Sequence, residues 1–232
     1  MTGAADVERS NRALSEAAYL IAHDLAEPLR EVSGFAGLLE RRCEGRLDEA
    51  ADEYLAHIVA GTRRMDAMLA GLSAFVASER APLEPETVDV AALVGSLASE
   101  RMASLDELGA EIACADLPTS TADARLAREL FDRLLDNAIR FRGEAPPQVE
   151  VFGERAGERV RYTVADRGIG VPDGEEEIVV KLFRRASNAA DHAGVGVGLA
   201  VAERIAERHG GGLDIGAREG GGVVVSVSLP AG

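Results

Sequence analysis

Two runs of mainly apolar residues with heptad spacing occupy the first third of the chain. In each run the residues recur at steps of three and four, which is the spacing of one apolar stripe along a helix. The pattern breaks around Cys43–Leu47, where Gly45 suits a turn. Residues 7–79 are therefore predicted to form a helical hairpin. The stripe residues are Leu14, Ala18, Ile21, Leu25, Pro28, Val32, Phe35 and Leu39 in the first helix, and Leu55, Ile58, Thr62, Met65, Leu69, Leu72 and Val76 in the second.

A hairpin of two helices has too small a core to be stable by itself. Two copies packed along their apolar stripes complete a four-helix bundle. The sequence therefore predicts a homodimer.

Two prolines follow the second helical pattern in a short acidic stretch. Pro82 and Pro85 cannot continue a helix, so residues 81–88 are predicted to be a linker. This linker would separate a helical domain, residues 1–80, from a second domain, residues 89–232.

Helical and strand-like patterns alternate in the second domain. Asp89 and Asp123 each precede a helical pattern and are suited to cap it, the first over about residues 90–105 and the second as far as Phe141. A glycine-rich irregular stretch runs from Gly168 to Gly198. The alternation predicts a two-layer α/β sandwich. Strands are expected at residues 111–115, 148–155, 159–166, 213–217 and 223–229, and a last helix at residues 200–209.

The charge balance of the chain limits its partners. A formal net charge of -15 argues against general nucleic-acid binding, which needs clustered Lys and Arg. No apolar run approaches the roughly 20 residues of a membrane span, and the first residues lack the form of a signal peptide. The two cysteines have neither metal-ligand nor disulfide spacing. We expect a cytoplasmic protein without a membrane or nucleic-acid partner.

One histidine in the first helix has unusual neighbours. His23 falls on the face opposite the apolar stripe, where its imidazole nitrogen is available as a nucleophile. Asp24 beside it is able to orient the ring or accept its proton. Pro28 removes a helical hydrogen bond to the carbonyl of Asp24, which costs about 3 kcal/mol in a helix interior. The alternative is an ordinary surface histidine on a dimerisation helix.

The helix that follows Asp123 carries polar residues suited to a nucleotide. Asn137 offers a neutral amide oxygen, which Mg²⁺ accepts together with phosphate and water oxygens. Arg133 and Arg140 lie one turn on either side of Asn137 and are placed to reach phosphates. A simple polar helix face is the alternative interpretation.

Asp166 and the glycines after it suit a flat, polar ring. A carboxylate at the end of a strand is able to accept a hydrogen bond from an exocyclic amine such as that of adenine. Gly168 and Gly170 allow the backbone a close approach or a positive φ. A tight turn is the alternative.

Three alternating glycines, Gly194, Gly196 and Gly198, stand just before the last helix. They allow backbone N–H groups to gather around phosphates at a helix N-terminus. A flexible loop is the alternative.

The order of these elements resembles the transmitter core of two-component sensor histidine kinases. The resemblance extends from about Ala18 to Pro230. Segment AHDLAEPLR is similar to the H-box of phytochrome-like kinases, LLDNAIRF to the N-box, DRGIG to the G1 box, VVKLFRR to the F-box and GVGVGL to the G2 box. The family implies a histidine-phosphotransfer hairpin followed by a catalytic domain of the Bergerat ATP-binding type.

The resemblance also implies a role for each matching residue. His23 would accept the γ-phosphoryl group of ATP with Asp24 as its acid/base partner, and Asn137 would hold Mg²⁺. Asp166 would bind the adenine amine in a pocket shaped by Gly168 and Gly170. The phosphates and the ATP lid are assigned to Arg140, Arg184 or Arg185, Gly194, Gly196 and Gly198.

The expected partners follow from the same resemblance. The phosphoryl group would pass to the receiver domain of a separate response regulator, and the signal would come from a separate sensory protein or a missing sensor domain. The same protein would also be able to act as a phosphatase on the phosphorylated regulator.

Four departures from the family pattern keep other functions open. Arg133 replaces an asparagine, Arg140 a lysine, Val195 a threonine and Val180 a phenylalanine. A dimeric phosphotransfer or scaffold protein with a degenerate ATP-binding domain is one alternative. An ATP-binding regulator that sequesters a partner without using His23 is another.

Overall fold

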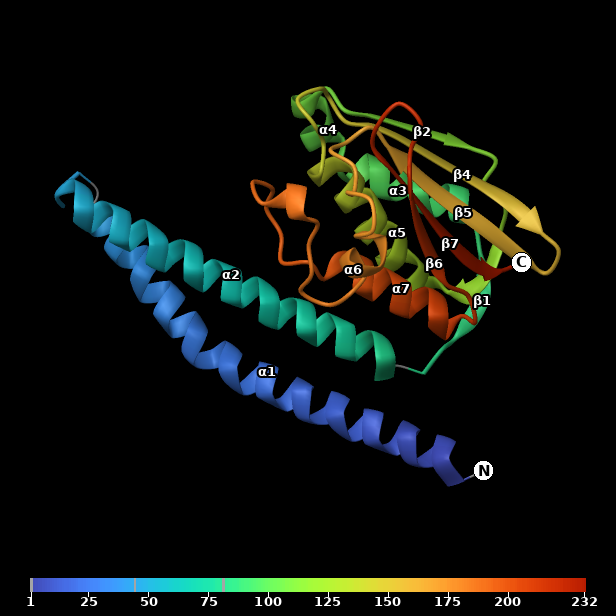
Figure 1. Cartoon of the computed structure of the whole chain (residues 1–232), viewed down its shortest axis with the longest axis horizontal. Coiled ribbons are helices and arrows are strands. Elements are labelled where there is room, and N and C mark those ends of the chain that lie inside the picture. The colour runs from blue at the N-terminus through green and yellow to red at the C-terminus, as the bar shows by residue number, and fades with distance from the viewer. Residues whose placement is uncertain (1, 44, 81) are drawn as a thin grey trace. The chain divides into compact units, whose positions relative to one another are not determined.

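The computed structural model of the chain is shown in Figure 1. It describes the backbone of residues 2–43, 45–80 and 82–232, and the side chains of residues 20–22, 24–43, 45–79, 82–102 and 105–232. The chain divides into two compact units, Met1–Ala77 and Ser78–Gly232. Within the described part of the chain, no helix has the length and apolar character needed to cross a membrane.

The first unit is an antiparallel pair of long helices, as the heptad spacing predicts. Helix α1 spans Thr2–Cys43 and helix α2 spans Glu49–Arg80. Gly45 has a φ of +66° at the turn between them, a conformation that glycine adopts without strain. Ser33 Oγ donates to a carboxylate oxygen of Asp66 at 2.9 Å and so ties the two helices together.

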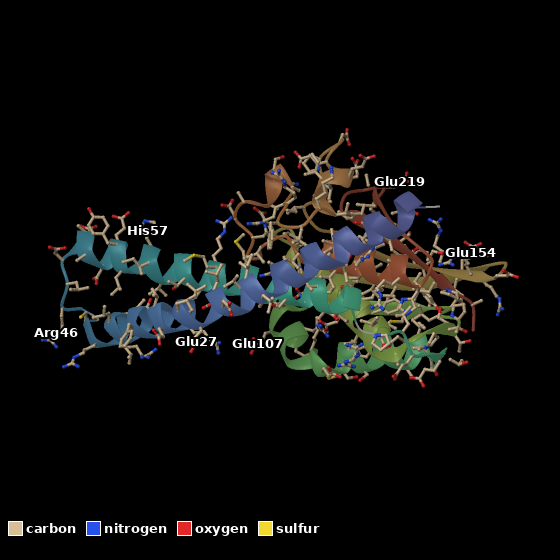
Figure 2. All side chains as sticks on the ribbon, turned by 90° about the horizontal axis from the view of Figure 1, so that it is seen from below. Glu27, Arg46, His57, Glu107, Glu154 and Glu219 are labelled. Carbon is tan, nitrogen blue, oxygen red and sulfur yellow. The ribbon has the colours of Figure 1, made fainter. Side chains whose placement is uncertain are left out.

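The apolar stripe of α1 is exposed within one chain, and smaller residues form the contact between the helices. Ile21, Val32 and Phe35 are 58%, 51% and 68% exposed, whereas Ala22 and Ala36 are buried. On α2, the stripe residues Thr62 and Val76 are buried, but Ile58 and Met65 are about half exposed. Figure 2 shows Glu27 and His57 on the outside of the hairpin. Among the described residues of the hairpin, many large apolar side chains are therefore about half exposed or more within one chain.

The second unit is a two-layer α/β sandwich, which confirms the predicted fold class. Five strands form one mixed sheet in the order β2-β4-β5-β7-β6, with β2 parallel to β4 and the other pairs antiparallel. Helices α5 and α7 pack against each other and against this sheet (Figure 1). The strands are β2 (Glu111–Ala115), β4 (Gln148–Ala156), β5 (Arg159–Asp166), β6 (Leu213–Ala217) and β7 (Val223–Pro230), and the helices are α3 (Val90–Glu100), α4 (Met102–Leu108), α5 (Ala124–Arg140), α6 (Glu176–Val179) and α7 (Gly198–Arg208).

Two helix caps were predictable and are present. Asp89 Oδ1 accepts the N–H of Ala92 at 2.9 Å at the start of α3, and Asp123 Oδ1 accepts the N–H of Leu126 at 3.0 Å at the start of α5. The predicted helix over residues 90–105 is divided in two at Arg101, which ends α3 with a φ of -97° and a ψ of -1° and precedes α4.

A small second sheet was not predicted. Strand β1 (Pro85–Val88) pairs antiparallel with β3 (Ser120–Asp123). The second half of the predicted linker, residues 81–88, is therefore a strand, with Val88 buried. Four residues are too few to reveal a period of two in the sequence.

Tyr162 links the main sheet to the segment before β3. Its hydroxyl donates to the carbonyl of Pro118 at 2.6 Å and lies 2.9 Å from Ser120 Oγ. Its ring meets Phe131 of α5 edge-on, with centroids 5.4 Å apart. Both rings are fully buried.

We expect Tyr162→Phe to lower the free energy of unfolding by about 1–3 kcal/mol, since it strips buried polar groups of their partner. Urea unfolding of the purified protein measures this change. Tyr54→Phe is the matched control, because Tyr54 is 67% exposed and its loss of a hydroxyl should change stability by less than about 0.5 kcal/mol. Equal effects of the two substitutions would contradict a stabilising role of the Tyr162 hydroxyl.

Candidate functional site

The candidate site lies in the α/β unit, where α5, the end of β5 and the start of α7 come together. Asn137 is on the last turn of α5, close to the first residue of α7. A Cβ atom added to Gly198 would lie 3.2 Å from Asn137 Oδ1. Among the residues that the structure describes, Asn137 Nδ2 is buried and has no hydrogen-bond partner. The amide is therefore held beside a helix N-terminus with unused hydrogen-bonding capacity.

Asp166 ends β5 and is only 9% exposed. One oxygen, Oδ1, accepts the N–H of Gly168 at 2.8 Å and the N–H of Val223 at 3.3 Å. Burial raises the pKa of Asp166, and these two N–H groups and the positive charge of Arg218 oppose that rise. The site thus contains a buried carboxylate with one oxygen fixed by backbone donors.

The loop after Asp166 is attached to the end of α5. Ile169 N–H donates to the carbonyl of Phe141 at 2.9 Å. A side chain at Gly168 would overlap this same carbonyl oxygen, so the approach requires glycine. Gly170 has a φ of +74°. The loop therefore brings Asp166 and the C-terminal end of α5 to one place.

Residues 171–197, which make up most of the glycine-rich stretch, fold back over this loop. Asn188 Nδ2 donates to the carbonyls of Ile169 and Gly170 at 3.0 and 3.2 Å. Phe183 N–H donates to Gly196 O at 2.7 Å, and a side chain at Gly196 would overlap the backbone of Arg184. The stretch has only one short helix, α6, and one 3-10 turn at Ser187–Ala189. We call residues 171–197 the lid, after the expectation from the sequence.

The arginines assigned to phosphates have different environments. Arg140 pairs with Asp136 at 2.5 Å and approaches Ala193 O at 3.5 Å, beside Gly194. Arg185 donates to the carbonyls of Ala189 and His192 within the lid. Arg184 is exposed. Arg140 and Arg184 are thus better placed for a ligand than Arg185, which orders the lid.

Three residues that hold parts of the candidate site together were not predicted from the sequence to belong to it. Asn188 holds the lid to the glycine loop, and Arg218 faces Asp166. His192 Nε2 donates to the carbonyl of Arg142 at 3.0 Å, and its ring lies 5.6 Å from that of Phe141. None of them has a characteristic spacing to the motifs, because long-range folding brings them together.

The predicted phosphoryl acceptor belongs to the helical unit. His23 lies on α1, but its side chain is outside the described residues. Asp24 is exposed on the same helix. The role of His23 therefore stays a prediction.

The geometry of the α/β unit agrees with a known class of domain. Residues 122–232 match the family described as "Histidine kinase-, DNA gyrase B-, and HSP90-like ATPase". This match covers Asn137, Asp166 and all the glycines of the candidate site. The α/β unit is an ATPase-type domain of this class.

The relatives extend the match to nearly the whole chain. Cyanobacterial phytochrome A of Nostoc sp. (strain PCC 7120) is 31% identical over 98% of this chain and 30% of its own length. The methanogenesis regulatory histidine kinase FilI of Methanothrix harundinacea is 31% identical over 97% of this chain and 25% of its own length. The structure of full-length ShkA in complex with AMPPNP has a TM-score of 0.68 and 26% identity, and covers 93% of this chain and 46% of that one.

These findings identify the chain as a sensor histidine kinase catalytic core. The chain spans between a quarter and a third of the length of the curated relatives named above. The site suits ATP, because it offers a buried carboxylate for a base, an amide with a buried N–H group that has no partner among the described residues, and glycines at a helix N-terminus, where backbone N–H groups are able to bind phosphates.

The raised pKa of Asp166 predicts the pH dependence of one variant. When the pKa of a carboxyl group is higher in the folded than in the unfolded state, the protein loses stability as the pH rises through the folded-state pKa. The ionised carboxylate of Asp166 is therefore expected to destabilise the folded state at neutral pH. Asp166→Asn keeps an oxygen for the two N–H donors and removes the charge. We expect its thermal midpoint to exceed that of the wild type at pH 7, with the difference closing towards about pH 4.

Thermal unfolding at both pH values tests this expectation. Asp173→Asn changes an exposed aspartate in the following loop and should leave the midpoint unchanged. A midpoint for Asp166→Asn below that of the wild type at pH 7 would show that the charge stabilises the fold.

Proposed function

We propose that this protein is an ATP-dependent histidine kinase that phosphorylates its own His23 and passes the phosphoryl group to an aspartate of a separate response regulator. One observation carries the proposal. Asn137, Asp166 and Gly198, which are far apart in the sequence, lie around one end of α5 beside the N-terminus of α7. ATP is the ligand whose base, phosphates and metal ion match these three elements together.

The residues of the α/β unit suit the needs of phosphoryl transfer. That reaction depends on positioning and on neutralising phosphate charge. Asp166 would accept the adenine amine, and Asn137 would give its amide oxygen to a phosphate-bound Mg²⁺. Backbone N–H groups at Gly196 and Gly198 and the guanidinium of Arg140 would balance negative charge.

His23 would act as the nucleophile in this scheme. Its neutral imidazole nitrogen forms a bond to the γ-phosphorus while the bond from that phosphorus to the bridging oxygen of ADP breaks. The proton released from the ring passes to Asp24 or to water. A carboxylate oxygen of the regulator then forms a bond to the same phosphorus while the bond from phosphorus to the ring nitrogen breaks, and this nitrogen takes up a proton, which regenerates neutral His23. A cytoplasmic location is part of this proposal.

A phosphotransfer scaffold with a degenerate ATP-binding domain is the second candidate. Arg133, at the first N-box position, pairs with Glu129 at 3.2 Å on its own helix. The chain therefore lacks the amide that the family has at this position. ATP binding by the purified protein separates the two candidates, since the scaffold would bind none.

Incubation with γ-labelled ATP and Mg²⁺ tests the kinase proposal. We expect the wild type to gain an acid-labile, base-stable label, which is the behaviour of a phosphohistidine. His23→Ala should carry no label, and Asn137→Ala should lose about a hundredfold or more in rate, because charge stabilisation at the phosphates is removed. His57→Ala, which removes another histidine of the hairpin that is 76% exposed, is the control and should label normally.

A label that persists in His23→Ala would contradict the assigned acceptor. A wild type that neither binds ATP nor gains label would contradict the kinase and favour the scaffold.

We also propose that two chains associate through the exposed stripe of α1 and α2. Ile21, Leu25, Val32, Phe35 and Ile58 are each at least half exposed. A second hairpin would bury these side chains in a four-helix bundle. The hydrophobic effect then favours the dimer in proportion to the apolar area removed from water.

Phe35→Glu is expected to weaken this dimer by more than about tenfold, because each copy would bury a carboxylate in an apolar interface. Sedimentation equilibrium measures the dissociation constant. Arg30→Glu alters an exposed charge of the same helix away from the stripe and should leave it nearly unchanged. Equal dissociation constants for the two variants would rule out this interface.

A further inference from the structure

The turn between β6 and β7 lies against Asp166 of the candidate site. It consists of Arg218–Gly222 and lies outside the H, N, G1, F and G2 boxes. Gly221 N–H donates to Arg218 O at 3.1 Å and Arg218 N–H donates to Gly222 O at 3.2 Å, so the turn is closed by its own backbone. Glu219, labelled in Figure 2, is exposed in this turn. The other end of the turn faces Asp166.

Gly222 lies directly against the backbone of Asp166. A Cβ atom at this position would overlap the Asp166 carbonyl oxygen and lie 2.7 Å from the carbonyl carbon and 2.8 Å from Arg167 Cα. Gly222 also has a φ of +102°. No other residue type fits without moving either the turn or the end of β5.

The residue after Gly222 holds the carboxylate itself. The N–H of Val223 reaches Asp166 Oδ1 at 3.3 Å, and the N–H of Gly168 reaches the same oxygen at 2.8 Å. Two donors from different segments fix the rotation of the carboxylate. The second oxygen, Oδ2, is then held in one orientation for a donor on a ligand.

Arg218 brings a positive charge to the same place. Its side chain is only 12% exposed and pairs with Glu150 at 2.5 Å. Its charge favours the ionised form of Asp166 and so lowers the pKa that burial raises. Among the described residues, Arg218 Nη1 is buried without a hydrogen-bond partner. The turn therefore supplies a donor, a cation and a close backbone contact to one carboxylate.

We propose that the β6–β7 turn, through Gly222, positions the Asp166 carboxylate and thereby sets the preference of the site for a purine that bears an exocyclic amine. Gly222 is a positioning residue, because it acts through Asp166 and not on the ligand. The proposal rests on the proposed function only in that ATP is the ligand. It does not require phosphorylation of His23.

The neighbouring glycine provides a matched control. Gly221 has a φ of +100°, and nothing lies within 4 Å of a Cβ atom added there. Gly222→Ala and Gly221→Ala therefore introduce the same backbone strain in the same turn. Only the first substitution collides with Asp166.

The test compares the dissociation constants of ATP and of purine riboside triphosphate, which lacks the 6-amino group. A hydrogen bond to a charged acceptor predicts that the wild type favours ATP by about tenfold or more. Gly221→Ala should keep this ratio. Gly222→Ala should bring the ratio close to one while binding of purine riboside triphosphate changes by less than about threefold. A general loss of structure would instead weaken both ligands alike.

A second pair of variants covers the case in which Gly222→Ala does not fold. Arg218→Gln removes the cation that faces Asp166, whereas Glu150→Gln breaks the same ion pair and keeps the cation. We expect a lower ATP preference in Arg218→Gln and an unchanged one in Glu150→Gln.

Each remaining result has a definite meaning. The same ratio in Gly222→Ala and Gly221→Ala, or in Arg218→Gln and Glu150→Gln, would overturn the role of the turn. A wild type that binds both triphosphates equally would overturn it as well. A wild type that prefers ATP but never gains label would support this inference and refute the kinase, and one that binds neither triphosphate would refute both.

Discussion

The buried carboxylate of Asp166 is the feature on which the local structure of the α/β unit depends most. An ionised group inside a protein is unstable unless donors and opposite charges surround it. Gly168 and Val223 give it backbone N–H groups, and Arg218 gives it a positive charge. Gly168 and Gly222 permit these approaches, since a side chain at either position would overlap a carbonyl. A buried carboxylate held in this way does not add to the stability of the fold. It does give a binding site a hydrogen-bond acceptor with a fixed orientation, which suits a base that carries an amine.

Helix α5 connects the core to the site. Its apolar face, which includes Leu130, Phe131 and Leu134, is buried against the sheet and fixes the rotation of the helix. That rotation points Asn137 towards the first turn of α7 and Arg140 towards the lid. The placement of the polar side chains is therefore a consequence of apolar packing, which accounts for how residues of different segments reach hydrogen-bonding distance.

The sequence predicts what depends on local pattern and misses what depends on long-range contact. Asp89 and Asp123 were recognisable as helix caps because a cap and its helix are adjacent in the chain. Strand β1 was missed because a four-residue strand is decided by its pairing with β3. The glycines 220–222 show the limit most clearly, since all three have positive φ and only Gly222 touches Asp166. Three consecutive glycines in a sequence do not reveal which of them contacts another segment of the chain.

The two units use their apolar residues in different ways. Phe131 and Tyr162 are buried within one chain of the α/β unit, and every residue of the candidate nucleotide site comes from that unit. In the hairpin the buried residues Ala22 and Ala36 are small, so the area removed from water is small, while Phe35 stays exposed. In the proposed dimer, association would add the hydrophobic stabilisation that Phe35 and the other exposed side chains do not gain within one chain. If the chain acts as proposed, nucleotide binding by the α/β unit does not depend on protein concentration. The stability of the helix that carries His23 does depend on it, because association stabilises the hairpin.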